Sequence, residues 1–207
     1  TPADKRLKKL DEQLAAFPYV DGALFAELLP HAAFDACMRQ LLLDCCALDW
    51  SRISPAIFGS LFQSVMDETL RRNLGAHYTT EKNILKLIKP LFMDALRAEF
   101  ERLKSQPRKL TEFHQRLARL KFLDPACGCG NFLVIAYREL RELELDILRV
   151  LYKENRTGSL DVSQFNILCD VDQFYGIEIE EFPAQIAQTA LWLMDHQMNL
   201  RVSEEFG

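Results

Sequence analysis

Several features that mark common classes of protein are missing from this 207-residue sequence. It has no run of 18 apolar residues and no signal peptide, which argues against a membrane span and against secretion. Its six cysteines form no C-x-x-C pair and its four histidines form no cluster, so no metal site is expected. Because free thiols are typical of a reducing compartment, we predict a cytoplasmic protein.

An unbroken run of one charge is also missing. The net charge is −5, with 25 basic and 30 acidic residues interspersed. No block of lysine or arginine stands out as a nucleic-acid patch, so a DNA-binding face is expected to be weak in this chain. A solvated helix face with ion pairs is expected after residue 132, formed by Arg138, Arg141, Arg149, Glu139, Glu142 and Glu144.

What the chain does have is helical periodicity, and with 49% hydrophobic residues it can bury a substantial core. Between residues 33 and 46 an apolar pair recurs every four residues, which predicts a helix with one wide buried face and places Cys37, Cys45 and Cys46 in the core. Ser54 as N-cap and Pro55 at the first position predict a second helix. We interpret residues 1–73 as a helical spacer domain.

Residues 74–80, Leu-Gly-Ala-His-Tyr-Thr-Thr, break this pattern. Thr79 or Thr80 can cap the helix that follows, which runs to about residue 103. Pro90 lies inside that helix and should kink it or split it in two. His77 is not expected to act as a general base, since no partner acid is evident.

The most informative segment is F-L-D-P-A-C-G-C-G-N-F, residues 122–132. It predicts a short apolar strand, a Gly-rich turn and a long helix with Asn131 as N-cap, the layout of a nucleotide-type crevice in an α/β sheet. The third glycine of a dinucleotide fingerprint is missing, which disfavours a nicotinamide dehydrogenase. An acid, Asp124, precedes the proline. Both details favour S-adenosylmethionine (SAM) over a bound pyrophosphate.

A second strand is predicted over residues 174–179, and it ends in an acid, Glu178. In doubly wound sheets a carboxylate at this place grips the two ribose hydroxyls with charge-assisted hydrogen bonds. Glu178 follows Asp124 by more than the roughly 20 residues of a plain βαβ unit. A long first helix and a surface excursion near residues 155–172 account for the difference. A further helix is predicted from Pro183, with buried positions as far as Met198.

These segments together predict a SAM site. Gly128 and Gly130 let the backbone pass close under the methionine moiety, and Asp124 anchors the turn and binds the ligand amino group. The start of the helix after Thr80 offers backbone N–H groups to the ligand carboxylate. The residues assigned to the site are Tyr78, Thr79, Thr80, Asp124, Pro125, Ala126, Cys127, Gly128, Gly130, Asn131, Phe132, Glu178 and Ile179.

These motifs resemble the amino-methylating DNA methyltransferases of the adenine-N6 type. G-A-H-Y-T-T is similar to motif X of that family, D-P-A-C-G-C-G-N-F to motif I and Y-G-I-E-I to motif II, in the gamma order. Cys129 stands where the family commonly has serine. Over about residues 48–200 the chain resembles large fused restriction–modification proteins, in which a helical spacer precedes the methyltransferase domain. The resemblance implies an α/β fold: a helical N-terminal region, then part of a Rossmann-like SAM-dependent methyltransferase fold over residues 74–207.

The chain departs from the family in one respect. The catalytic motif of the family, Asn-Pro-Pro followed by Tyr or Phe, holds the flipped adenine, and no Pro-Pro occurs in this sequence. No catalytic residue is therefore assigned, and we expect a piece of a larger protein that holds the cofactor half of the site and is inactive alone. The resemblance implies double-stranded DNA as the partner of the intact protein, with weak or no binding by this piece. Its open sheet edge and exposed apolar surface predict that it can dimerise.

Two alternatives stay open on the sequence. A SAM-dependent methyltransferase of RNA or of a protein amide would share the same cofactor half. A non-catalytic module would use its helices to dock a partner subunit and its sheet as a scaffold, and it would not need to bind SAM.

Overall fold

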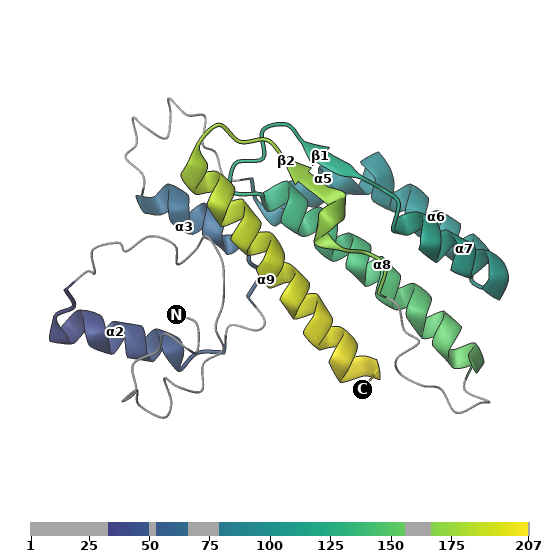
Figure 1. Cartoon of the computed structure of the whole chain (residues 1–207), viewed down its shortest axis with the longest axis horizontal. Coiled ribbons are helices and arrows are strands. Elements are labelled where there is room, and N and C mark those ends of the chain that lie inside the picture. Colours follow the sequence, from purple (N-terminus) through teal and green to yellow (C-terminus); the bar gives the residue numbers. More distant parts are fainter. Residues whose placement is uncertain (1–32, 50–52, 66–78, 156–166, 207) are drawn as a thin grey trace, which may run out of the picture. The chain divides into compact units, whose positions relative to one another are not determined.

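The computed structural model describes residues 33–49, 53–65, 79–155 and 167–206 (Figure 1). The chain divides into two compact units, Thr1–Asp49 and Trp50–Gly207. The predicted boundary between the spacer and the methyltransferase region, at residues 73 and 74, lies outside the described residues and stays a prediction.

The described part of the first unit is helix α2 (Ala36–Cys46). Asp35 begins it, because its side-chain oxygen accepts a hydrogen bond from the N–H of Met38 at 2.8 Å. The predicted buried face is not observed: every α2 side chain is exposed, including those of the three cysteines at positions 37, 45 and 46. The core assignment of these cysteines is therefore wrong, since no other element within the described residues of this unit covers the apolar stripe.

Helix α3 (Ile57–Val65) begins the described part of the second unit. It starts two residues later than predicted, where the carbonyls of Ser54 and Pro55 accept the N–H groups of Ile57 and Phe58 at 3.0 and 3.1 Å. The Ser54 hydroxyl is buried and has no hydrogen-bond partner in the described part of the chain. The predicted side-chain cap by Ser54 is therefore wrong.

Pro90 divides the next helical segment, as predicted. Helix α5 (Glu81–Ile88) runs into one π-helical turn, η3 (Lys89–Met93), and continues as α6 (Asp94–Leu103). Proline has no N–H to donate and its ring crowds the carbonyl one turn earlier, so a widened turn accommodates it. Helix α7 (Pro107–Leu117) then packs against α6 and buries Leu110, Phe113, His114 and Leu117.

A small parallel sheet and two long helices form the centre of the second unit (Figure 1). Strand β1 (Phe122–Asp124) pairs with β2 (Phe174–Gly176), which follows a short 3-10 turn, η5 (Val171–Gln173). Helix α8 (Asn131–Asn155) contacts α5, α7, both strands and α9 (Glu181–Phe206). Strand, helix and parallel strand in this order confirm the α/β class, although most described residues are helical.

Within the described residues, helices cover one face of the sheet. Phe122 stacks on Phe174 with ring centroids 4.7 Å apart, and Tyr137 of α8 meets Phe174 edge-on at 5.3 Å. On the opposite face Leu123 and Tyr175 are 63% and 49% exposed. The described helices therefore shield one side of the sheet and leave the other open.

A charged cluster lies between α8 and α9, where the sequence predicted a solvated face. Arg141 is 1% exposed, and its guanidinium donates to Asp195 at 3.0 Å, to Asn199 at 2.8 Å and to the Tyr137 hydroxyl at 2.6 Å. The solvated face is wrong at this residue because α9 covers it. Among the described helices, none combines the length and the apolar character that crossing a bilayer requires.

Candidate cofactor-binding site

The Gly-rich turn after β1 is shaped by its glycines and by an acid. Gly128 and Gly130 have φ angles of +54° and +78°, a region that glycine enters without steric cost. Asp124 Oδ1 accepts a hydrogen bond from the N–H of Ala126 at 3.1 Å, so this carboxylate anchors the turn as predicted. The positive φ angles of the two glycines and the Asp124 hydrogen bond therefore set the shape of this turn.

Gly130, and not Asn131, precedes the first turn of α8. The Gly130 carbonyl accepts the N–H of Val134 at 2.9 Å. The Asn131 side chain instead lies against Gly59 of α3, and its Oδ1 is buried with no hydrogen-bond partner in the described residues. The predicted N-cap is wrong by one position. A Cβ on Gly130 would lie 2.8 Å from the Ala187 Cβ of α9, so close packing requires glycine there.

The chain after β2 brings Glu178 to this turn. The N–H of Cys127 donates to the Ile177 carbonyl at 3.0 Å, which extends the pairing past the end of the strand. Glu178 Oε2 accepts the N–H of Gly128 at 2.9 Å, and its Oε1 accepts the N–H of Glu180 at 3.0 Å. The predicted proximity of this carboxylate to the turn is confirmed, and its role in binding stays a prediction.

There is free space beside the turn. A Cβ built on Gly128 would meet no heavy atom of the described residues within 4 Å, so among these residues the backbone faces open space next to the Glu178 carboxylate. A nucleoside ligand with an amino-acid tail needs such a close backbone approach and an anionic acceptor for its hydroxyls. The residues present therefore fit the cofactor that the sequence predicts.

An open groove of about 570 Å³ adjoins the turn. Cys127 and Glu178 line it near the turn, and Gln188 and the 59% exposed Trp192 line it along α9. Its volume falls within the range of about 300–1,000 Å³ that is usual for small-molecule sites. The groove gives a ligand held at the turn room to extend along β2.

The other predicted site residues lie in varied surroundings. Thr80 takes the N-cap position of α5 by its backbone, while its side chain makes no capping hydrogen bond. Thr79 and Phe132 are half-buried, and Ile179 is 91% exposed. Tyr78 lies outside the described residues. Pro125 and Ala126 are exposed on the turn.

An ion pair ties the start of α5 to α8. Arg138 donates to Glu81, the first residue of α5, at 2.7 Å. The two helices also pack against each other. The described threonines 79 and 80 therefore precede a helix fixed to the one that follows the turn, although no hydrogen bond joins either of them to the turn itself in the described structure.

Burial raises the pKa of both cysteine thiols in the turn. Desolvation, followed by the negative charge of Glu178 and the electrostatic interaction with Cys127, raises the pKa of Cys129 to about 11. Desolvation and the carboxylates of Asp124 and Glu178 raise the pKa of Cys127. Both thiols therefore stay protonated near neutral pH and are poor nucleophiles. Within the described ranges no three His, Cys, Asp or Glu side chains gather as a metal site would need.

Glu144, which the sequence analysis placed in solvent, is buried and fixes the chain that leads into β2. Its Oε1 accepts the N–H groups of Leu168 and Cys169 at 2.7 and 3.0 Å and lies 2.7 Å from His114 Nε2. The sequence did carry a signal that Glu144 is buried, because it falls on the buried arc of α8, seven residues after Tyr137.

Gln173 makes a second connection of this kind. Its side-chain amide donates to the carbonyls of Leu117 and Leu120 at 2.7 and 3.0 Å, and its oxygen accepts the N–H of Asp170 at 2.9 Å. Because Leu120 leads into β1, this side chain ties the approaches to the two strands together. No sequence signal distinguished this glutamine from a surface residue.

Comparison with known proteins identifies relatives of this chain. The family model for the DNA-methyltransferase domain of MmeI matches residues 100–207. DNA methyltransferase A of Bacillus subtilis (strain 168) is 44% identical over 193 residues, which are 93% of this chain and 21% of that protein. The adenine-specific methyltransferase BrxX of Escherichia coli O9:H4 (strain HS) is 28% identical over 83 residues, covering 40% of this chain and 6% of that protein.

A solved structure is also similar over the full length of the chain. The type IIL restriction-modification enzyme MmeI, in complex with DNA, matches with a TM-score of 0.86 and 66% sequence identity. The match covers 100% of this chain and 27% of that one. The chain thus spans 21% of the Bacillus subtilis methyltransferase, 6% of BrxX and 27% of the MmeI chain.

Proposed function

Because the chain belongs to the family of the MmeI DNA-methyltransferase domain, we propose that it forms the SAM-binding part of a DNA methyltransferase that modifies adenine at N6. The observation that carries this proposal is the Glu178 carboxylate, hydrogen-bonded to the N–H of Gly128 at the edge of an open Gly-rich turn. The intact protein would belong to a restriction–modification system.

Three findings support DNA and adenine as the target. The solved relative is a restriction–modification enzyme in complex with DNA. A second relative is named an adenine-specific methyltransferase. The order of the G-A-H-Y-T-T and D-P-A-C-G-C-G-N-F segments resembles the gamma order of adenine-N6 enzymes. Together they favour a DNA base over an RNA or protein substrate.

SAM supplies a methyl group on a positively charged sulfur, open to attack by an amine nitrogen. In this chain Glu178 would accept hydrogen bonds from the two ribose hydroxyls, because its carboxylate already stands beside the turn. Gly128 would keep the ligand space free of side chains. Asp124, whose Oδ1 holds the turn, has a second oxygen that can receive the ligand amino group.

The remaining contacts would come from the two flanks of the turn. The hydroxyls of Thr79 and Thr80, with Tyr78 and the first N–H groups of α5, would receive the ligand carboxylate at the positive end of the helix dipole. Phe132 and the exposed Ile179 would give the adenine ring of the cofactor an apolar surface. Pro125, Ala126, Cys127, Gly130 and Asn131 would shape the turn.

Methyl transfer by such a site depends mainly on bringing the target amine into line with the methyl group. The Asn-Pro-Pro motif that holds the flipped base in the family is absent from these 207 residues. We therefore expect this chain alone to transfer no methyl group from tritiated SAM to duplex DNA in a filter-binding assay. Incorporated radioactivity above a protein-free control would contradict this.

Calorimetric titration with SAM tests the proposal. Glu178→Gln keeps the shape of the side chain but removes the charge that strengthens the ribose hydrogen bonds, which are worth about 1.5–3 kcal/mol each. We expect SAM affinity to fall about 10- to 100-fold in this variant. Glu180→Gln, an exposed position two residues away with the same change of charge, should bind like the unaltered chain.

Two results would contradict the assignment of the SAM site. One is the absence of SAM binding by the unaltered chain. The other is equal loss of affinity in both variants, which would mean that net charge and not the carboxylate at position 178 matters. Thermal unfolding of all three proteins checks that each is folded, because Glu178 also accepts a backbone hydrogen bond in the turn.

A further inference from the structure

Positive charge is concentrated in one segment of a chain whose net charge is −5. Residues 102–121, from the end of α6 through α7 to β1, contain seven lysines and arginines and one acid, Glu112, a net of +6. No long run of basic residues marks this segment, because they are spaced along the helix. The fold is what gathers them.

Four of these residues form a basic stripe along α7 and the turn after it: Arg108, Lys109, Arg116 and Arg119. At about 100° per residue the three positions within α7 fall within an arc of about 100°, opposite the buried arc of the helix, and Arg119 follows in the next turn. All four side chains are exposed. At about 1.5 Å of rise per residue the stripe is about 16 Å long.

Most of this charge is not neutralised within the chain. In the described structure no carboxylate lies within ion-pair distance of Arg108, Lys109 or Arg119. Arg116 pairs with Glu99 of α6, which also pairs with Arg102 at 3.5 Å. The carboxylate of a single acid is thus shared between two arginines, so even the paired part of this surface keeps a positive excess.

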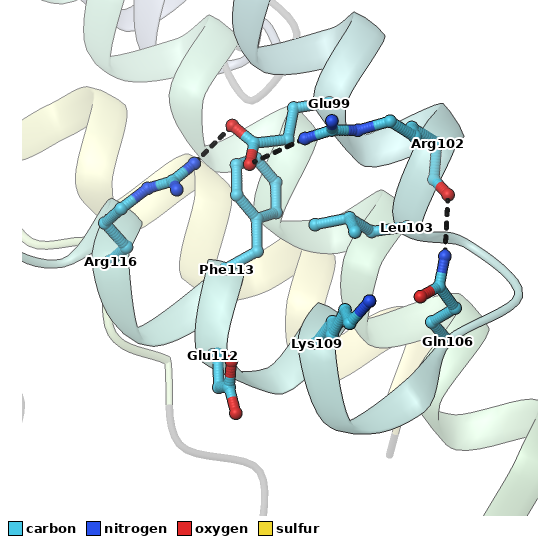
Figure 2. Close-up of a pocket in the computed structure, with 8 residues that line it drawn as sticks. All are labelled: Glu99, Arg102, Leu103, Gln106, Lys109, Glu112, Phe113 and Arg116. Atoms are coloured by element: carbon cyan, nitrogen blue, oxygen red, sulfur yellow. Dashed lines mark hydrogen bonds and ion pairs between the residues drawn. The ribbon is translucent and has the colours of Figure 1, made fainter.

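A groove lies beside the basic stripe, and Arg116 of the stripe is held there by its ion pair with Glu99. Between α6 and α7 lies an open groove of about 480 Å³, lined by Arg102, Lys109 and Arg116 with Glu99 and Glu112 (Figure 2). Figure 2 shows Glu99 between the two guanidinium groups that it pairs with. Holding these guanidinium groups in place lowers the conformational entropy that they would lose on binding an anion.

We propose that the basic stripe binds the phosphate backbone of duplex DNA and positions the duplex on this part of the chain. The inference rests on the proposed function, since it gives a chain proposed to act on DNA a place where DNA is held. Duplex DNA carries about one negative charge per 1.7 Å of axis when both strands are counted, so a stripe of this length lies within reach of several phosphates. Such contacts fix the register of the duplex and read no sequence.

Fluorescence anisotropy of a labelled 30-base-pair duplex, titrated with the full 207-residue chain between 50 and 200 mM NaCl, tests this proposal. The triple variant Arg108→Gln, Lys109→Gln and Arg119→Gln removes the three unpaired charges. We expect the slope of log affinity against log salt to become shallower by about 3, one for each phosphate that is no longer neutralised. Affinity at 50 mM NaCl should fall on the order of tenfold or more.

A matched control removes three exposed cations outside the stripe: Arg39→Gln, Lys86→Gln and Lys89→Gln. It should keep the slope of the unaltered chain. Equal losses in both triple variants would overturn the proposal, because net charge would then explain the binding. No measurable duplex binding by the unaltered chain at 50 mM NaCl would overturn it as well. Circular dichroism of each variant verifies the helical content.

A conservative variant and a second ligand complete the test. Arg108→Lys with Arg119→Lys keeps the charges and should keep the salt slope; its loss would overturn a phosphate-binding role. SAM titration of the same proteins separates the two proposals. If the chain binds SAM and the triple Gln variant keeps its affinity for the duplex, only the proposal for the basic stripe is overturned. If DNA binding depends on the basic stripe but the chain does not bind SAM, only the proposed cofactor function is overturned.

Discussion

Glycine is needed at the two positive-φ positions of the turn for different structural reasons. Gly130 packs on Ala187 so closely that an added Cβ would lie 2.8 Å from the alanine Cβ. Gly128 has open space where its Cβ would be. One glycine therefore sets how near α8 and α9 approach each other, and the other keeps the proposed cofactor space clear.

Alanine substitutions at these positions should separate the two reasons. Gly130→Ala combines a left-handed backbone, about 1–2 kcal/mol, with overpacking of about 1–3 kcal/mol, so we expect the free energy of unfolding to fall by about 2–5 kcal/mol. Gly128→Ala should lose only about 1–2 kcal/mol but weaken SAM binding. Urea unfolding measures both values. Equal stability of the two variants would contradict the packing argument.

The sequence predicted elements well where covalent chemistry decides the backbone. Pro90 interrupts its helix and the glycines open the turn, because their φ preferences and hydrogen-bonding capacity act locally. Burial was predicted less well, because it depends on partners distant in sequence. The apolar stripe of α2 is exposed, whereas the charged Arg141 is covered by α9.

The same lesson applies to the candidate site. A motif and a strand end were enough to place Glu178 beside the turn, since parallel strands bring their carboxyl ends together. The buried Glu144 and Gln173, which hold the approach to β2, were missed. Glu144 lies on the buried arc of α8 but was grouped with its charged neighbours as a solvated face, and no periodic pattern distinguishes Gln173. The sequence thus indicated where Glu178 lies but not the buried residues that support the approach to β2.

Two glutamates on α8 provide a test of this support. Glu144→Gln removes one of the two carboxylates that pair with the buried Arg141, at 3.3 Å, while Asp195 stays at 3.0 Å, so we expect the free energy of unfolding to fall by about 1–3 kcal/mol. Glu142→Gln removes an exposed pair with Arg201 and should cost about 0–1 kcal/mol. Chemical denaturation compares the two. A loss below 1 kcal/mol at position 144 would show that the buried network does not stabilise this part of the fold.

At the scale of the whole molecule, the described second unit is covered on one side only. The helices bury one face of the sheet, while Leu123, Tyr175 and Ile177 are 63%, 49% and 57% exposed on the other side and beyond the strand end. Two strands also leave two free edges. The chain spans 27% of the solved relative, in which the matching residues are part of a much longer polypeptide.

We expect this chain to self-associate in isolation. Sedimentation velocity at increasing concentration should show a growing dimer population, driven by burial of the open sheet face. Leu123→Lys should reduce it, whereas Leu91→Lys, at a residue that is 69% exposed on η3, should not. A purely monomeric chain, or equal effects of the two lysines, would contradict a role for the sheet face.

The contact between Gly130 and Ala187 has an evolutionary consequence. Two positions far apart in the chain meet where there is room for one methyl group between two helices. A larger side chain at either place would push α8 and α9 apart and carry the turn away from the strand that follows. Drift at 187 is therefore restricted to very small residues, and because the backbone at 130 has a positive φ, position 130 should stay glycine in sequences that have diverged from this one.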